Sequence, residues 1–302
     1  MENNMRLKGK NALVTGGGNG IGKAIALLLG QHGANVMVND LGTNELGEGS
    51  DATPAEQTAT EIRAAGGTAA SCLADVATFD GAGKVVSDTE EAFGRVDIAV
   101  NCAGAAIEGS IFEMSEELYH KTIALQMSQK WFIARQVVPH MVEQGWGRVI
   151  NTTSHGAMGD LGQPAFAAAM GGVISMTKAL ATETAGTGVT VNCLAPGAAT
   201  RLHAKSHDDF LAWREAGIID EEMWQSYLNT PPPEYVAPIV GWLCSDAADY
   251  ISGQVLHAAG GQVSVWSSYI EERSIYRGDH KSVDPWTLEE LDQLVPRNLI
   301  PK

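Results

Sequence analysis

The stretch Thr15-Gly16-Gly17-Gly18-Asn19-Gly20-Ile21-Gly22 decides the fold of this chain. It follows an apolar run that predicts a strand and begins a segment with helical periodicity. In such a turn Gly16 permits a tight bend, Gly20 lets the backbone approach a pyrophosphate, and Gly22 allows the helix to pack closely on the strand. Free N–H groups at the helix N-terminus then face the phosphates. The stretch therefore predicts a dinucleotide-binding unit.

Short apolar runs alternate with helix-length segments along most of the chain. This alternation predicts a Rossmann-type, doubly wound α/β fold, with seven parallel strands and helices on both faces of the sheet. The expected strands are Asn11–Thr15, Asn35–Asn39, Thr68–Ala74, Asp97–Asn101, Gly147–Thr153, Thr190–Leu194 and Gln254–Ala258. The expected helices include Gly20–Gln31, Pro54–Ala65, Gly81–Phe93, Ser115–Gln144 and Pro164–Ala185.

Asp40 ends the second expected strand and indicates which dinucleotide is bound. A carboxylate at this place accepts hydrogen bonds from the adenosine ribose and repels a 2′-phosphate. Residues 16–22 and 39–44 contain no Arg or Lys that would attract that phosphate. The sequence predicts NAD rather than NADP.

Composition excludes several other classes of function. The net charge of −16 argues against nucleic acid or an anionic membrane surface as the main partner. The four cysteines form no CxxC pair, so we expect reduced, mostly buried thiols and no metal site. The first ten residues are polar, and no run approaches the ~20 apolar residues of a membrane span. We expect a cytoplasmic protein.

Further motifs place the chain beside a known family. TGGGNGIG at 15–22, NCAG at 101–104, GRVINTTS at 147–154 and LAPGAAT at 194–200 together resemble the short-chain dehydrogenase/reductase family over about residues 8–262. The resemblance implies that residues 1–262 form an NAD-binding domain. It also implies the cofactor-binding residues Gly16, Asn19, Gly20, Ile21, Gly22, Asp40, Leu41, Asp75, Val76, Asn101, Ala103, Gly104, Pro196, Gly197 and Thr200.

At the family's catalytic positions the resemblance breaks down. The family's Tyr-x-x-x-Lys, in which the Tyr transfers a proton and the Lys lowers its pKa and holds the ribose, corresponds here to Phe166 and Met170. The family's Ser corresponds to Thr153, and its structural Asn to Gln126. Phe166 has no proton to transfer and Met170 carries no charge.

Neighbouring side chains are candidates to replace that chemistry. Ser154 could substitute for Thr153 with a one-residue shift. A positioned general acid or base contributes ~10²–10⁴-fold to a rate, and His155 is the nearby side chain whose ordinary pKa suits proton transfer. A loop histidine that points to solvent or lines the pocket is the simpler interpretation of His155. Asp160 and Tyr227 are more distant candidates.

Two segments lie outside the strand–helix alternation. Residues 201–232 contain Phe210, Trp213, Trp224 and Tyr227, where the family places its substrate lid; an amphipathic pair of helices packed on the body is the alternative. Residues 263–302 form a tail, in which Thr287 and Glu290 have the spacing of a capping box and predict a short helix.

These observations leave three functions open. The first is an NAD(H)-dependent oxidoreductase that acts on a hydrophobic alcohol, ketone or acyl thioester with non-standard acid/base residues. The second is a catalytically silent subunit paired with an active paralogue, and the third is a redox-neutral cyclase or isomerase. The resemblance implies a dimer or tetramer, homomeric or heteromeric, that uses the helices at 115–144 and 164–185.

Overall fold

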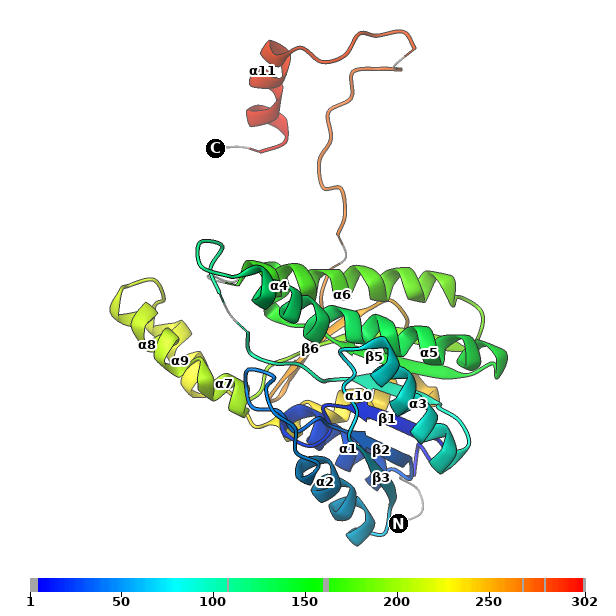
Figure 1. Cartoon of the computed structure of the whole chain (residues 1–302). Coiled ribbons are helices and arrows are strands. Elements are labelled where there is room, and N and C mark those ends of the chain that lie inside the picture. Colours follow the sequence, from blue (N-terminus) through cyan, green and yellow to red (C-terminus); the bar gives the residue numbers. More distant parts are fainter. Residues whose placement is uncertain (1–4, 108, 160–162, 268, 280, 301–302) are drawn as a thin grey trace. The chain divides into compact units, whose positions relative to one another are not determined.

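Parallel strands with helices on both faces form the body of the protein in the computed structural model (Figure 1). The structure describes residues 5–107, 109–159, 163–267, 269–279 and 281–300. The strand order is β3-β2-β1-β4-β5-β6-β7-β8, so the direction of winding reverses between β1 and β4. Ligands bind outside the carboxyl ends of the strands at such a reversal, and the glycine-rich turn after β1 lies there.

The predicted strands and helices are found within a few residues of their expected bounds. The strands are β1 Asn11–Thr15, β2 Asn35–Asn39, β3 Thr68–Cys72, β4 Ile98–Asn101, β5 Gly147–Thr152, β6 Val189–Pro196, β7 Val255–Ala259 and β8 Gln262–Val265. The α-helices are α1 Gly20–Gln31, α2 Thr53–Ala64, α3 Phe79–Phe93, α4 Glu116–Ile123, α5 Gln129–Glu143, α6 Pro164–Glu183, α7 Arg201–Lys205, α8 His207–Glu215, α9 Glu221–Leu228, α10 Ala237–Leu243 and α11 Leu288–Asn298.

The prediction of seven strands was wrong by one. β8 adds an eighth strand, antiparallel to β7, with Ala259 opposite Gln262. The turn between them is Gly260-Gly261, and Gly260 takes the positive φ of 53° that a tight reversal requires. β8 therefore belongs to the body, and the chain divides into the units Met1–Trp266 and Ser267–Lys302 rather than after residue 262.

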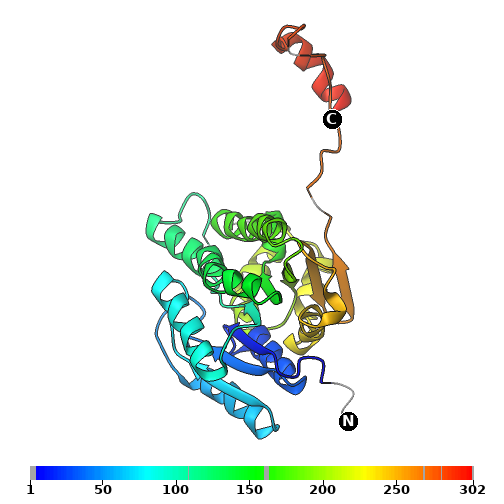
Figure 2. The same ribbon diagram turned by 90° about the vertical axis from the view of Figure 1, so that its right-hand side faces the viewer.

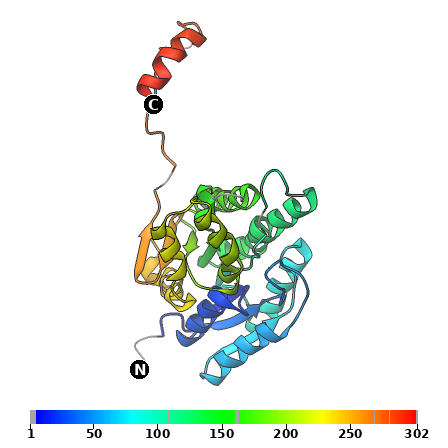
Figure 3. The same ribbon diagram turned by 90° about the vertical axis from the view of Figure 1, so that its left-hand side faces the viewer.

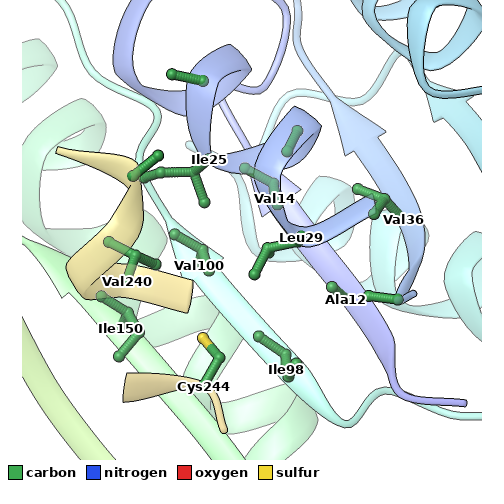
Figure 4. Packing of buried hydrophobic residues seen from close by; sticks show 14 of the residues in the cluster. Ala12, Val14, Ile25, Leu29, Val36, Ile98, Val100, Ile150, Val240 and Cys244 are labelled. Carbon is green, nitrogen blue, oxygen red and sulfur yellow. The ribbon is translucent and has the colours of Figure 1, made fainter. Parts of the chain in front are cut away.

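Two apolar layers hold the helices on the sheet. Adjacent residues of one strand face opposite sides, and both are buried: Val14 packs toward α1 and α10, whereas Leu13 packs toward α3 and α5. Figure 4 shows Ile25 of α1 and Val240 of α10 meeting the first layer. Because both faces are covered, the central strands are buried along their whole length, and their burial does not alternate.

The expected long helix at 115–144 consists of three consecutive pieces. α4 begins after Ser115, whose hydroxyl accepts the N–H of Leu118, and a π-helical turn at Ala124–Ser128 joins α4 to α5. π-turns inside α-helices often mark functional sites. In the two side views α4, α5 and α6 lie together on one side of the sheet (Figures 2 and 3).

α6 is the one described helix whose length and composition would suit a membrane span. Its buried residues include Ala169, Val173 and Ile174, and Val173 and Ile174 share an apolar cluster with Cys193 of β6. This packing is that of a core helix in an α/β protein.

Residues 201–232 contain three helices, one more than the expected pair, and the tail contains the short helix that its sequence predicts. α7, α8 and α9 occupy 201–228, and Ile219, Trp224 and Tyr227 form a small core of their own with Phe210 packed on it. In the separate unit Ser267–Lys302, the capping box of Thr287 and Glu290 begins α11 as expected.

Candidate functional site

The turn between β1 and α1 has the geometry of a phosphate cradle. Gly16 adopts a φ of 66°, and a Cβ placed on Gly22 would lie 2.1 Å from the carbonyl oxygen of Gly16. Asn19 precedes the helix without a side-chain cap, which leaves the first N–H groups of α1 available to a ligand. These features fit a pyrophosphate at the N-terminus of α1.

Asp40 is held in place by two backbone groups. Its Oδ2 accepts the N–H of Gly18 at 2.9 Å and its Oδ1 accepts the N–H of Gly42 at 2.8 Å. The carboxylate is almost fully buried at the end of β2, yet it lines a cavity. Each carboxylate oxygen accepts more than one hydrogen bond, so Asp40 can still receive ribose hydroxyls.

A cavity of about 290 Å³ extends along the carboxyl ends of the strands. Most of the residues predicted to bind the cofactor line it: Gly16, Asn19, Gly20, Ile21, Gly22, Asp40, Leu41, Asp75, Val76, Ala103, Gly104 and Thr200. Pro196 lines the neighbouring cavity instead. Asn101 and Gly197 line neither, because the Asn101 side chain donates to Asn151 within the sheet and the Gly197 N–H pairs with Ala258.

Sequence reasoning missed two cations at this cavity. Lys121 of α4 and Arg201 of α7 both line it. Each lies 3.9 Å from a carboxylate of the loop after β2, Lys121 from Glu48 and Arg201 from Glu45. No local motif links these residues, which the tertiary fold brings together.

A second cavity of about 300 Å³ adjoins the first. The two share part of their walls, including Ile21, Cys102 and Gly104. The second cavity brings together five of the six residues predicted at catalytic positions: Gln126, Thr153, Ser154, Phe166 and Met170. The sixth, His155, does not line it.

Hydrogen bonds fix the polar members of this group. The buried Thr153 hydroxyl donates to the carbonyl oxygen of Met170 at 3.0 Å. The Ser154 hydroxyl accepts the N–H of Gly156, and the Gln126 amide donates to the carbonyl of Ala105. The hydroxyl proton of Thr153 is therefore already used in a hydrogen bond, while the hydroxyl oxygen can still accept one.

No charged side chain lines the second cavity among the described residues. Its titratable member is Cys102, and burial raises the pKa of that thiol to about 12. The thiol is consequently neutral and unreactive near physiological pH. The described part of its lining offers hydroxyl, amide and apolar groups, and no acid or base suited to neutral pH.

His155 is not among the described residues that line this cavity, and its role as a replacement acid stays a prediction. Its Nε2 lies 3.2 Å from Nδ1 of His257 on β7, and its ring packs edge-on against Trp266. The Tyr227 hydroxyl donates to the carbonyl of His203 within the lid. Asp160 lies outside the described residues.

Comparisons with known proteins agree with this architecture. The family described as "Enoyl-(Acyl carrier protein) reductase" matches residues 16–262. A "(2S)-[(R)-hydroxy(phenyl)methyl]succinyl-CoA dehydrogenase subunit BbsD" of Thauera aromatica is 32% identical over 264 residues, covering 85% of this chain and 98% of the relative.

Two solved structures share the fold. A short-chain dehydrogenase from Mycobacterium avium has a TM-score of 0.77 and 31% identity, and the alignment covers 95% of this chain and 93% of that one. A 7α-hydroxysteroid dehydrogenase complexed with NADH and a bile acid has a TM-score of 0.72 and 28% identity, with 86% and 97% covered. The chain belongs to the short-chain dehydrogenase/reductase family.

Proposed function

We propose that this chain is an NAD(H)-binding oxidoreductase of hydrophobic acyl thioesters or related alcohols and ketones, with non-standard residues at the acid/base positions. One observation carries the proposal. A cavity with a phosphate cradle and a carboxylate suited to a ribose adjoins a second cavity, whose described lining is uncharged and includes all but one of the predicted catalytic positions.

The preference for NAD rests on Asp40 and on the pairing of nearby cations. Asp40 is oriented by Gly18 and Gly42, and its charge would repel a 2′-phosphate. Lys121 and Arg201 could attract that phosphate, but each lies 3.9 Å from a glutamate of the loop after β2, Glu48 and Glu45 respectively. Asp40 and these pairings therefore favour the ribose without phosphate.

The thioester preference rests on relatives and on the chemistry that the second cavity permits. The matching family is described by enoyl reduction on an acyl carrier protein, and the Thauera relative is named for a CoA thioester. NAD, when bound, supplies or accepts a hydride. The side chains of Gln126 and Ser154 can hydrogen-bond a carbonyl oxygen without transferring a proton. Such a site suits an activated double bond, where hydride delivery needs less help at oxygen.

A catalytically silent subunit is the second candidate. The absence of a charged side chain from the described lining of the second cavity favours it, because ordinary ketone reduction relies on a proton donor. The Thauera relative is itself named as a subunit. In this case the chain would bind NAD(H) and shape an assembly in which an active paralogue performs the chemistry.

Titration and turnover distinguish these functions. We expect the purified chain to bind NADH and to consume it faster with 2-enoyl-CoA thioesters than with 3-oxoacyl-CoA thioesters, whose ketone needs more help at oxygen. Failure to bind NADH would overturn the proposal. Binding without turnover on either substrate would favour the silent subunit, and purification from the native source should then yield a second dehydrogenase-like chain.

A further inference from the structure

A fully buried lysine lies directly behind the second cavity. Lys130 is in the first turn of α5, immediately after the π-helical turn at Ala124–Ser128, and its side chain is shielded from solvent. Its Nζ donates to the carbonyl oxygen of Gln126 at 2.7 Å. Gln126 lines the second cavity, so the ammonium group contacts the backbone of a residue that forms the wall of this site.

No carboxylate compensates this charge among the described residues. None of the ion pairs found there includes Lys130. The titratable groups that interact with the Lys130 ammonium group are two thiols, that of Cys102, which directly follows β4, and that of Cys193 on β6. Burial raises the pKa of these thiols to about 12 and about 11, so both stay neutral at physiological pH.

An unpaired buried ammonium is costly. The effective penalty for burying one charge is several kcal/mol, even after the protein relaxes around it. Burial accordingly lowers the pKa of Lys130 to about 8, which leaves the side chain mostly protonated at neutral pH. A charge with this cost, next to an uncharged cavity, points to a role in what that cavity binds.

We propose that the ammonium group of Lys130 supplies, from behind Gln126, the positive charge that Met170 lacks, and that it makes the site bind NADH in preference to NAD⁺. The inference rests on the proposed binding of NAD(H) in the adjoining cavity. Lys130 is a positioning residue, because Gln126 lies between it and the ligand.

Electrostatics give the direction of the effect. The nicotinamide ring carries a positive charge in NAD⁺ and none in NADH, so a nearby cation opposes the oxidised form only. The described lining of the cavity carries no opposite charge that would offset this repulsion. The same charge would stabilise the negative charge that develops on a substrate carbonyl oxygen when a substrate carbon accepts the hydride, before a proton from solvent completes the reduction.

Lys130→Met tests this role, since it keeps the length of the side chain and removes the charge. We expect the ratio of the NAD⁺ to the NADH dissociation constant to fall by about tenfold, equivalent to ~1.4 kcal/mol. Lys84→Met on the exposed face of α3 is the matched control and should leave the ratio unchanged. Adding Met170→Lys to the Lys130→Met variant should restore the ratio, because it returns a cation to the same site.

If Lys130 had only a structural role, Lys130→Met would raise the dissociation constants of NAD⁺ and NADH by the same factor. That result would overturn the inference. Should the variant not fold, the parent answers the question through pH. Its NADH preference should decline as pH rises through the pKa of about 8, and a flat ratio would contradict the role of the ammonium group. If the parent binds neither cofactor form, the proposed function itself fails, which is a distinct outcome.

Discussion

The two adjoining cavities differ in what holds their chemistry. The first cavity, called the cofactor cavity because most of the residues expected to bind NAD line it, depends on backbone groups. These are the glycine turn, the helix N-terminus and the two N–H groups that orient Asp40. The second cavity depends on side chains, and those in the described part of its lining carry no charge. Backbone groups survive most substitutions as long as the fold persists, whereas a single side-chain change removes a proton donor.

This comparison explains how the cavity built from backbone groups can keep its geometry while the side-chain chemistry of the second cavity changes. Phe166 and Met170 occupy a helix whose backbone still serves the cavity, since the carbonyl of Met170 accepts the Thr153 hydroxyl. Replacing a side chain on that helix alters the chemistry without disturbing the sheet or the glycine turn. Each prediction below changes one of the two halves and measures whether the other responds.

The largest expected effect comes from returning an acid to the second cavity. Phe166→Tyr with Met170→Lys should tighten NADH binding and create turnover on hydrophobic alcohols, most readily with Thr153→Ser added. A positioned acid or base is worth ~10²–10⁴-fold in rate. Turnover and NADH titration on the parent, both single variants and the double variant measure this.

Neither single change should suffice, because a tyrosine without the lysine keeps a pKa near ~10. A double variant that folds but binds NADH no better than the parent would show that residues 166–170 do not correspond to the catalytic helix of the family.

The next effect concerns stability around the second cavity. Lys130→Met should raise the free energy of unfolding at neutral pH by ~2 kcal/mol, because it removes an unpaired buried charge. The pKa of Lys130 is about 8 in the folded protein, against ~10.4 when unfolded. Between these values the unfolded chain binds more protons, so the parent gains stability as pH rises and the advantage of the variant shrinks.

Urea unfolding of both proteins at neutral and alkaline pH measures this difference. A variant that is less stable than the parent at neutral pH would mean that the ammonium group is compensated by a partner.

A smaller effect tests the cofactor cavity. NADH should bind at least ~10-fold tighter than NADPH, or ~1.4 kcal/mol. Asp40→Ala should narrow that gap, since it removes the ribose acceptor and the repulsion of phosphate. Glu45→Gln should also narrow the difference in affinity between NADH and NADPH, because it removes the carboxylate that pairs with Arg201 and leaves this cation available to the 2′-phosphate. Calorimetric titration with both cofactors decides, and equal affinities in the parent would contradict the NAD assignment.

The smallest effect is expected at His155. Because its ring faces His257 and Trp266, His155→Ala should leave NADH affinity and any turnover within about twofold, below ~0.5 kcal/mol. His257→Ala is the matched control on the same contact. A large loss of turnover confined to His155→Ala would return this residue to the list of acid candidates.

Local patterns predicted most of the fold. The bounds of β1, β2 and α1 agree with the expected residues because each is short, strongly apolar or periodic, and followed by a glycine or polar turn. The eighth strand was missed because QVSV is only four residues long and pairs through a turn of two glycines. The π-turn within 115–144 was missed because its sequence has the apolar pattern of an ordinary helix.

For the site, the sequence by itself determined the glycine cradle, the carboxylate at Asp40 and the identities of Thr153, Phe166 and Met170, because these lie in contiguous motifs whose geometry is local. Only the tertiary structure decided that Lys121 and Arg201 reach the cofactor cavity, that His155 turns toward β7, and that Lys130 is buried behind Gln126. Such facts depend on how helices pack over the sheet. That packing brings together residues far apart in the chain, and it sets side-chain direction, solvent exposure and pKa, none of which a local pattern encodes.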